Sequence, residues 1–233
     1  MKRCFLMIMG LIFIALSPLY CADFDRIGES VALELRQPIA ASPTPEIRNR
    51  TEFLRKLPQG GIVAEIGVQR GVLSEMILDR CNPKELYLID CWEEQENAIY
   101  MEEKGGNVNQ KRQKQLYHKV KKKFGKDSRV KIIKAYSPAA SAAFSDEFFD
   151  WVYLDANHAY WAVKLDLEAW FAKVKPGGYL CGHDYATSQK SSCPFGVIPA
   201  VNEFVKNHNL KIELLSIEGN PSYAIRKPST SPK

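Results

Sequence analysis

The stretch GIVAEIGVQRGVLSEMILDR, residues 61–80, has the pattern of a strand, a glycine turn and a helix in succession. The apolar run at 61–68 is short, as is typical of a buried parallel strand. Gly67 and Gly71 stand where this strand must end, and glycine allows a backbone to turn tightly and to approach a ligand closely. Because open α/β sheets bind ligands at the carboxyl ends of their strands, this turn predicts one wall of a binding site.

Strands and helices alternate through the rest of the chain. Apolar runs predict strands at 61–68, 85–90, 130–136, 148–156 and 177–185, and helical spacing predicts helices at 45–57, 71–80, 108–125, 137–144, 160–174 and 197–207. Strand–helix units without a repeat period predict a mostly parallel sheet with helices on both faces. The last two predicted strands, 211–217 and 222–227, are joined by a short turn and must be antiparallel. The sequence therefore predicts one α/β domain over residues 45–229, with a seven-stranded sheet that ends in an antiparallel hairpin.

Length and composition are those of an ordinary globular chain. The 233 residues are 45% apolar and 25% charged, which favours one domain with its own hydrophobic core. The formal net charge of +5 is too small to indicate a nucleic-acid partner. Beyond the N-terminal segment the cysteines are Cys81, Cys91, Cys181 and Cys193, none in a CxxC pair, so no zinc site is expected. A disulfide is possible if the protein is exported.

Residues 1–22 differ in character from the rest of the chain. Lys2 and Arg3 precede an apolar run, Pro18 ends the run, and the small or neutral residues Cys21 and Ala22 follow, which is typical of a secretory signal peptide. The run is shorter than a membrane span, although an uncleaved N-terminal anchor is the alternative. We expect an exported or membrane-anchored protein, with a cytosol-facing domain possible, and a linker or arm over residues 23–44.

Two acidic residues near predicted strand ends indicate the kind of ligand. Asp90 ends the second strand, about 20 residues past the glycine turn, where an acid can accept hydrogen bonds from ribose hydroxyls. A lone aspartate there is more often a helix cap, but the glycine turn favours the nucleoside interpretation. Glu65 would repel a pyrophosphate and suits a cationic or amine-bearing ligand, and the turn lacks the lysine of a phosphate loop.

Several motifs in order resemble the class I S-adenosylmethionine-dependent methyltransferases, and more narrowly the small-molecule O-methyltransferase-like group that includes the macrolide-sugar enzymes. These motifs are EIGVxxGxxS, LIDxW, AYSPAAxxxF, FDWVYLDAxHxYxxVxxDLxxW and VKPGGYLxGHDY. The resemblance covers residues 47–227 and implies a Rossmann-like sheet, S-adenosylmethionine as cofactor and a small-molecule acceptor, which could be anionic or contain a sugar.

The same resemblance implies which residues form the cofactor pocket. The residues expected around the methionine end of the cofactor are Glu65, Gly67, Val68 and Gly71. Those expected around the nucleoside are Asp90 at the ribose, Cys91 and Trp92 beside the adenosine, and Ser137 near the adenine.

Polar residues follow the fourth and fifth predicted strands, whose carboxyl ends should face one crevice. Asp155 and His158 follow the fourth strand, and His183 and Asp184 end the fifth. The carboxylates of Asp155 and Asp184 could hold a hard cation such as Mg²⁺, which would lower the pKa of a substrate hydroxyl. His158 could take the proton, because an imidazole titrates near neutrality.

Each of these residues has a structural alternative. Asp155 could cap the following helix with help from Asn157, and His158 could simply pack and hydrogen bond. Metal-dependent relatives often present an acidic pair where this chain has Asp184 and Tyr185, which weakens the metal prediction. The alternatives to an enzyme of this class are a non-catalytic nucleoside-binding protein and, less favoured, a nicotinamide-dependent oxidoreductase.

Two further groups of charged residues have simple explanations. Asp166 and Glu168 are expected on the surface of their helix. The basic run that includes residues 121–123 is expected to be a solvated face, with a positive rim that favours anionic substrates as the alternative.

Overall fold

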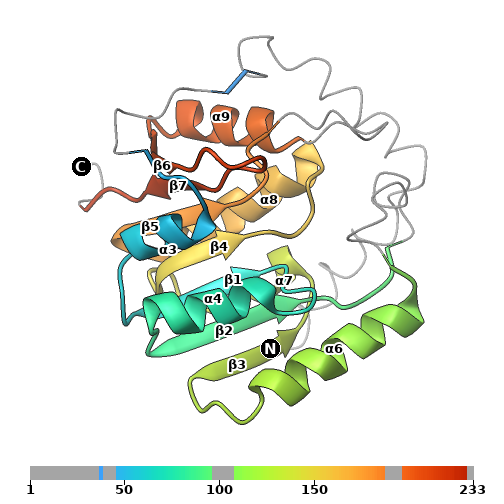
Figure 1. Ribbon diagram of the computed structural model, residues 1–233. Coiled ribbons are helices and arrows are strands. Elements are labelled where there is room, and N and C mark those ends of the chain that lie inside the picture. The colour runs from blue at the N-terminus through green and yellow to red at the C-terminus, as the bar shows by residue number, and fades with distance from the viewer. Residues whose placement is uncertain (1–36, 39–45, 96–107, 187–195, 230–233) are drawn as a thin grey trace, which may run out of the picture.

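The computed structural model describes residues 37–38, 46–95, 108–186 and 196–229 (Figure 1). The elements in chain order are α3 (Arg50–Lys56), β1 (Ile62–Ile66), α4 (Val72–Cys81), β2 (Glu85–Asp90), α6 (Gln110–Phe124), β3 (Val130–Lys134), α7 (Ser137–Ser141), β4 (Phe149–Leu154), α8 (Tyr160–Phe171), β5 (Val174–Gly182), α9 (Val197–Asn207), β6 (Ile212–Leu215) and β7 (Tyr223–Arg226). The segment expected to be a signal or anchor, and most of the expected arm, lie outside the described residues, so both stay predictions. Within the described ranges, no helix has the length and apolar character needed to cross a membrane.

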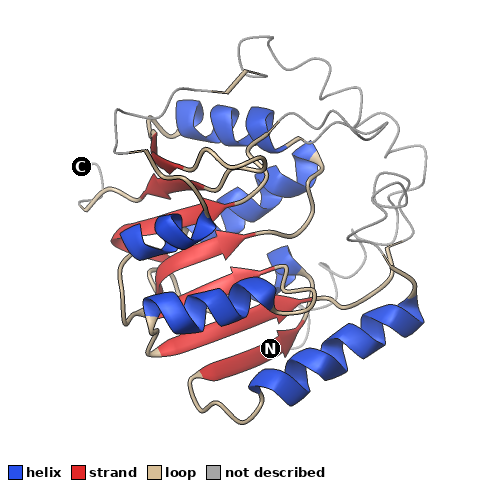
Figure 2. Cartoon of the chain, in the orientation of Figure 1, coloured by secondary structure: helices blue, strands red, loops and turns tan. Residues whose placement is uncertain are grey.

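The strands form one seven-stranded sheet in the order β3-β2-β1-β4-β5-β7-β6. Neighbours from β3 to β5 pair in parallel, whereas β7 pairs antiparallel with both β5 and β6. The predicted sheet, its antiparallel C-terminal hairpin and the helices on both faces are confirmed (Figure 2). Strand order reverses at β1, which lies between β2 and β4, and open α/β sheets bind ligands above such a switch point.

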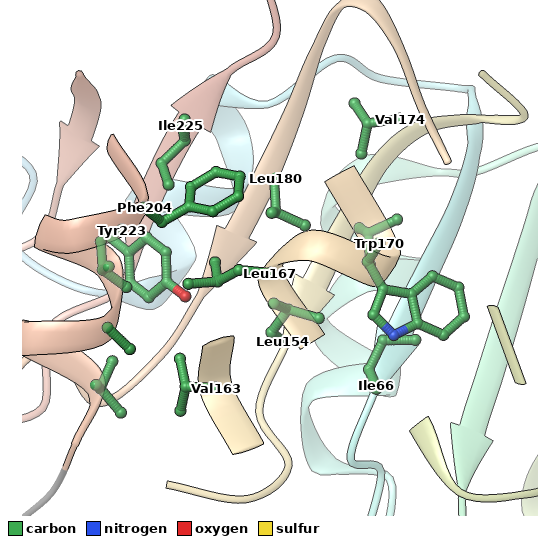
Figure 3. Packing of buried hydrophobic residues seen from close by; sticks show 14 of the residues in the cluster. Ile66, Leu154, Val163, Leu167, Trp170, Val174, Leu180, Phe204, Tyr223 and Ile225 are labelled. Atoms are coloured by element: carbon green, nitrogen blue, oxygen red, sulfur yellow. The ribbon is translucent and has the colours of Figure 1, made fainter. Parts of the chain in front are cut away.

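An apolar cluster covers each face of the sheet. On one face, Leu154 and Leu180 pack with Leu167, Trp170 and Phe204 of α8 and α9 (Figure 3). The other face is covered by α3, α4 and α6, and Figure 1 shows α3 and α4 in front of the sheet with α8 behind it. The two clusters hold the strands together as one sheet, and because β1 to β5 are parallel their carboxyl ends lie along one edge.

The first described helix begins later than predicted, because the residues before it pair with the sheet. Ile47 forms a parallel bridge with Ser216, which keeps this segment extended. Asn49 then caps α3, since its side chain accepts a hydrogen bond from the backbone N–H of Glu52 at 3.0 Å. The bridge and the cap together fix the position of Arg50, the first residue of the helix.

The carboxyl ends of β1 and β4 meet at Gly67. The backbone N–H of Asp155 donates to the carbonyl oxygen of Ile66 at 2.7 Å. Gly67 has a φ of +89°, and a Cβ on it would lie 2.0 Å from the carbonyl oxygen of Asp155. Glycine is therefore required here by the protein's own backbone, whereas the sequence indicated the approach of a ligand.

Asp166 points into the core, and the expectation that it lies on the helix surface is wrong. Its side chain is 5% exposed and accepts a hydrogen bond from Ser137 Oγ at 2.5 Å. Trp170 Nε1 donates to the same hydroxyl oxygen at 2.9 Å, so the three residues tie α7 to α8. Helical periodicity failed here because both α7 and α9 pack against α8 and cover more of its circumference. Burial raises the pKa of Asp166 to about 7, although the Ser137 hydrogen bond opposes this.

We expect Gly67→Ala to lower the free energy of unfolding by about 2–4 kcal/mol, the scale of overpacking and backbone strain together. Urea unfolding monitored by circular dichroism measures the change. The matched control is Gly219→Ala, because a Cβ on Gly219 meets no atom within 4 Å, and its effect should stay within about 0.5 kcal/mol. Equal stability of the two variants would contradict the close approach of β1 and β4.

We expect the unfolding free energy of Asp166→Asn, measured relative to that of the native protein, to increase as pH rises from about 4 to about 7. The pKa of Asp166 is about 7 in the folded protein and 3.8 ordinarily. As pH rises between these two values, the carboxyl group ionises more readily in the unfolded chain, so the native protein loses stability. Above about pH 7 the loss does not grow further. The difference in unfolding free energy should reach up to about 4 kcal/mol. Urea unfolding at several pH values measures it, with Asp79→Asn on the exposed surface of α4 as the control. A pH-independent difference would contradict the raised pKa.

Candidate functional site

The turn after β1 is braced by Asp90, the last residue of β2. Its Oδ2 accepts hydrogen bonds from the backbone N–H groups of Val68 and Gln69 at 2.9 and 2.8 Å, and its Oδ1 accepts one from that of Trp92 at 2.7 Å. Burial raises the pKa of Asp90, against the effect of these backbone hydrogen bonds. A carboxylate offers about four acceptor sites, so the brace leaves the predicted ribose contact open.

Glu65 is a buried carboxyl group beneath the same turn. It is 1% exposed and accepts a hydrogen bond from Ser74 Oγ of α4 at 2.5 Å. Burial raises its pKa well above the usual range, and the hydrogen bond from Ser74 lowers it. The charges of Asp155 and Asp90 raise the pKa further, whereas that of Arg50 lowers it. Glu65 is thus coupled to charged groups from β2, α3 and the end of β4.

Trp92 and Cys91, both expected beside the adenosine, occupy different environments. Trp92 is fully buried, its Nε1 donates to the carbonyl oxygen of Gln69 at 3.0 Å, and its ring packs on Tyr117. Cys91 is half-buried next to Asp90. The indole of Trp92 therefore packs inside the fold, and the adenosine contacts of both residues stay predictions.

Ser137 and its neighbour Tyr136 lie at the end of β3. The Ser137 hydroxyl is engaged by α8, as described above, and its contact with the adenine stays a prediction. Tyr136 is 50% exposed, and its hydroxyl donates to Glu93 at 2.9 Å.

Four polar side chains meet at the carboxyl ends of β4 and β5. His158 Nε2 lies 2.9 Å from Asp184 Oδ2 and 3.8 Å from Asp155 Oδ1. His183 Nδ1 lies 3.0 Å from the same oxygen of Asp184. The helix α8 is entered through Ala159, whose backbone N–H donates to Asn157 Oδ1 at 2.8 Å. Asn157 therefore forms a turn just before the helix, whose N-cap residue Ala159 provides no side-chain capping hydrogen bond, and the Asp155 carboxylate lies among the histidines.

Asp184 is the centre of this cluster. Its Oδ1 accepts a hydrogen bond from Asn220 Nδ2 at 2.5 Å, while Oδ2 faces both imidazoles. Burial acts to raise the pKa of Asp184, but hydrogen bonds and positive charge from His158 and His183 outweigh it and hold this pKa below its usual range. Its φ of +56° lies in the left-handed region, which persists where surrounding contacts hold the backbone. Asp184 is thus a fixed, ionised acceptor between two histidines.

Arg50 joins the cluster from α3, and sequence reasoning missed it. One terminal nitrogen lies 3.8 Å from Asp155 Oδ2 and the other contacts His183 Nε2. The guanidinium lies 6.0 Å from the centre of the Tyr153 ring, and the side chain is 21% exposed. No sequence signal singles it out, because it is one of several basic residues of its helix.

The same cluster could hold a cation. One donor atom each from Asp155, His158 and Asp184 lies within 4.8 Å of the others. Mg²⁺ prefers oxygen ligands, whereas an imidazole nitrogen suits a transition metal such as Zn²⁺ or Fe²⁺. Asp184 Oδ2 faces both imidazoles, so a metal would have to displace at least one of those contacts. The set therefore fits a mixed nitrogen–oxygen site better than the two-carboxylate Mg²⁺ site expected from the sequence.

A small cavity adjoins the cluster on the side of α8 and α9. Its lining combines polar and apolar residues, namely Leu154, Ala156, Asn157, His158, Val163, Asp166, His183, Val197 and Tyr223. It is thus a partly apolar space bordered by both imidazoles.

The basic residues of α6 make local contacts. Lys123 pairs with Glu75 of α4 at 2.5 Å, and the Lys121 ammonium lies 5.4 Å from the centre of the Tyr117 ring. The expected positive rim toward an anionic substrate stays a prediction. Among the described cysteines, Cys81, Cys91 and Cys181 are free thiols.

The sequence and the fold both match known methyltransferases. A family model described as a methyltransferase domain matches residues 64–185, which is more than half of the chain. No significantly similar sequence was found among curated proteins. The matched residues include the glycine turn, Asp90 and the Asp155–Asp184 cluster.

Solved structures share the fold at low sequence identity. A Corynebacterium glutamicum protein has a TM-score of 0.54 and 13% identity, with 91% of this chain and 92% of that chain covered. An S-adenosylmethionine-dependent methyltransferase from Aquifex aeolicus has a TM-score of 0.52 and 14% identity over 88% and 97% of the chains. The 1,6-didemethyltoxoflavin-N1-methyltransferase of Burkholderia thailandensis, solved with S-adenosylhomocysteine, has a TM-score of 0.50 and 12% identity over 76% of each chain. With the family match and this topology, the chain belongs to the class I methyltransferase family.

Proposed function

We propose that this protein transfers the methyl group of S-adenosylmethionine to a hydroxyl group of a small molecule, with His158 as general base. The observation that carries the proposal is the position of Asp155. Its backbone N–H binds the end of β1 at the glycine turn, and its carboxylate lies with His158. Asp155 therefore links the turn expected to bind the cofactor with the histidine expected to take a proton.

In this proposal the residues around the β1 switch point bind the cofactor. Glu65, Gly67, Val68 and Gly71 would surround its methionine end, and Asp90 its ribose. The buried carboxylates suit a ligand with a sulfonium and an ammonium group and would oppose a pyrophosphate, which favours S-adenosylmethionine over a nicotinamide dinucleotide. The structure of a family member with bound S-adenosylhomocysteine supports the same choice of cofactor.

The chemistry requires one proton acceptor beside the acceptor hydroxyl. With Nε2 of His158 donating to Asp184, Nδ1 carries the lone pair that takes the hydroxyl proton. The oxygen then attacks the methyl carbon, the C–O bond forms as the C–S bond breaks, and S-adenosylhomocysteine leaves. Ionised Asp184 stabilises the resulting imidazolium. A neutral amine is nucleophilic enough to attack before it loses a proton, whereas a hydroxyl becomes a good nucleophile only as its proton is removed, so a base in this position favours a hydroxyl acceptor.

A bound cation would supply positive charge that lowers the pKa of the acceptor hydroxyl. Asp155, His158 and Asp184 are the residues that would hold it. A nitrogen lone pair that binds a metal cannot also accept a proton. General base and metal ligand are therefore competing roles for His158.

We expect S-adenosylmethionine and S-adenosylhomocysteine to bind in isothermal titration calorimetry, and NAD not to bind. The reason is the buried acidic environment of Glu65 beneath the glycine turn. Binding of NAD alone would favour an oxidoreductase, and binding of none of the three would refute the proposed function.

We expect His158→Ala to lower kcat for methyl transfer by roughly 10²–10⁴-fold, the usual contribution of a general base. The dissociation constant of S-adenosylhomocysteine should change less than about twofold, because the base does not hold the cofactor. Release of S-adenosylhomocysteine with a panel of neutral and acidic hydroxylated sugars and metabolites measures turnover, and exposed His118→Ala on α6 is the control.

Three results bear on the alternatives. Unchanged turnover in His158→Ala would remove the base assignment. Loss of turnover with EDTA that an added divalent cation restores would show that turnover needs a bound metal, with which the base role of His158 would compete. Cofactor binding with no turnover on any acceptor of the panel would favour a non-catalytic binding protein.

A further inference from the structure

Asp166 of α8 presents a buried carboxyl group to the cavity beside the imidazoles. The residue is 5% exposed and lines this cavity. Its Oδ1 accepts the hydrogen bond from the neutral hydroxyl of Ser137, whereas its Oδ2 has no hydrogen-bond or ionic partner among the residues that the structure describes. Burial raises the pKa of this carboxyl group, and no cation in the described part of the chain offsets the effect. One carboxyl oxygen is therefore available to a group that enters the cavity.

The hydroxyl of Tyr223 on β7 is a second polar group of this cavity that makes no hydrogen bond to a described residue. Tyr223 is 1% exposed, and a buried tyrosine hydroxyl usually has a partner. A Cβ on Gly182 would lie 2.4 Å from this oxygen, so glycine at the end of β5 leaves room for it. The hydroxyl points toward α8 (Figure 3). After the larger effect of burial, the charge of nearby Asp166 helps to raise the pKa of Tyr223.

Both imidazoles on the cavity wall are neutral in the form of the site that takes up a proton. A guanidinium can only donate, so His183 Nε2 accepts from Arg50 and its Nδ1 donates to Asp184. His158 donates to the same carboxylate through Nε2 and keeps the lone pair of Nδ1. The described residues of the wall include no lysine or arginine. The cavity thus offers hydrogen-bond acceptors and one uncompensated carboxylate, which favours a cationic group.

The size and walls of the cavity suit a short carbon chain. It encloses about 260 Å³ together with its opening, which is less than the roughly 300–1,000 Å³ of a pocket for a drug-sized ligand. Leu154, Val163 and Val197 give it apolar walls, and His158 borders the same space. One small molecule can therefore place a hydroxyl group at His158 and a second polar group deeper in the cavity.

We propose that the acceptor is a short amino alcohol, whose ammonium group binds Asp166 and Tyr223 while its hydroxyl group faces His158. This inference rests on the proposed function, because it takes His158 as the base for a hydroxyl. Ionised Asp166 keeps the amine protonated, so its nitrogen has no lone pair and the methyl group goes to oxygen. His158 takes the hydroxyl proton, the C–O bond forms as the C–S bond breaks, and the ammonium group keeps its protons.

Calorimetry with the protein saturated with S-adenosylhomocysteine tests this recognition. The ligands are short amino alcohols and, for comparison, the diols and hydroxy acids of the same carbon skeletons. Amino alcohols should bind roughly 10- to 100-fold more tightly than the diols, the scale of a hydrogen bond between charged groups. Hydroxy acids should bind most weakly, because Asp166 repels a second carboxylate. With S-adenosylmethionine, the methylated product of the amino alcohol should be an ether.

Two variants remove one contact each with little change of shape. Asp166→Asn keeps an oxygen for Ser137 and should lower the ratio of amino-alcohol to diol affinity by roughly 10- to 100-fold. Tyr223→Phe should lower this ratio by roughly 2- to 10-fold, because it removes a neutral hydroxyl. Glu168→Gln is the control, since it makes the same carboxyl-to-amide change at an exposed position of α8 and should keep the native ratio.

The possible failures of the inference and of the proposed function differ. Absence of amino-alcohol binding, diols or hydroxy acids bound as tightly, or an unchanged ratio in Asp166→Asn would overturn the inference. Binding of S-adenosylmethionine with methyl transfer to another hydroxyl acceptor would then leave the proposed function standing. If the native protein does not bind S-adenosylmethionine, the proposed function fails and the inference fails with it.

Discussion

The contact between the ends of β1 and β4 is the constraint on which the candidate site depends. The hydrogen bond from Asp155 to Ile66 leaves no room for a side chain at Gly67, and the turn after β1 must bend in a left-handed conformation there. Because Asp155 also carries a carboxylate, the same residue joins the strands and faces the histidines. Two segments far apart in the sequence are thereby held within one site.

The charged groups at this edge of the sheet differ in how well neighbouring groups compensate for their burial. Asp184 faces both imidazoles and Asn220, which keeps it ionised despite burial. Glu65 is buried, and its one hydrogen bond comes from the neutral hydroxyl of Ser74. A buried charge that is already satisfied orients its neighbours, whereas one that is poorly satisfied is available to a ligand. The first description fits Asp184 as a support for His158, and the second fits Glu65 beneath the glycine turn.

Most of the fold was predictable, because the spacing of apolar residues indicates which face of a helix or strand packs against the rest of the protein. The strands of the parallel sheet appear in the sequence as short apolar runs. The short turn predicted between the last two strands indicated an antiparallel pair, which β6 and β7 form. Three features were not predictable in this way. Ile47 joins the sheet through a bridge to a distant residue, Asp166 is buried by two neighbouring helices, and Arg50 reaches its partners across more than a hundred positions of sequence. Each depends on packing between elements, which leaves no local pattern.

The sequence by itself determined the order of the elements, the parallel sheet with its final hairpin, and the polar residues at the strand ends. These follow from local preferences and from the rule that parallel strand ends share one edge. Only the tertiary structure decided that Asp184 is held between His158 and His183, that Asp90 braces the glycine turn, and that Arg50 of α3 contacts His183. These relations are set by distances between residues on different elements, and such distances exist only once the sheet and its two helical layers have packed together.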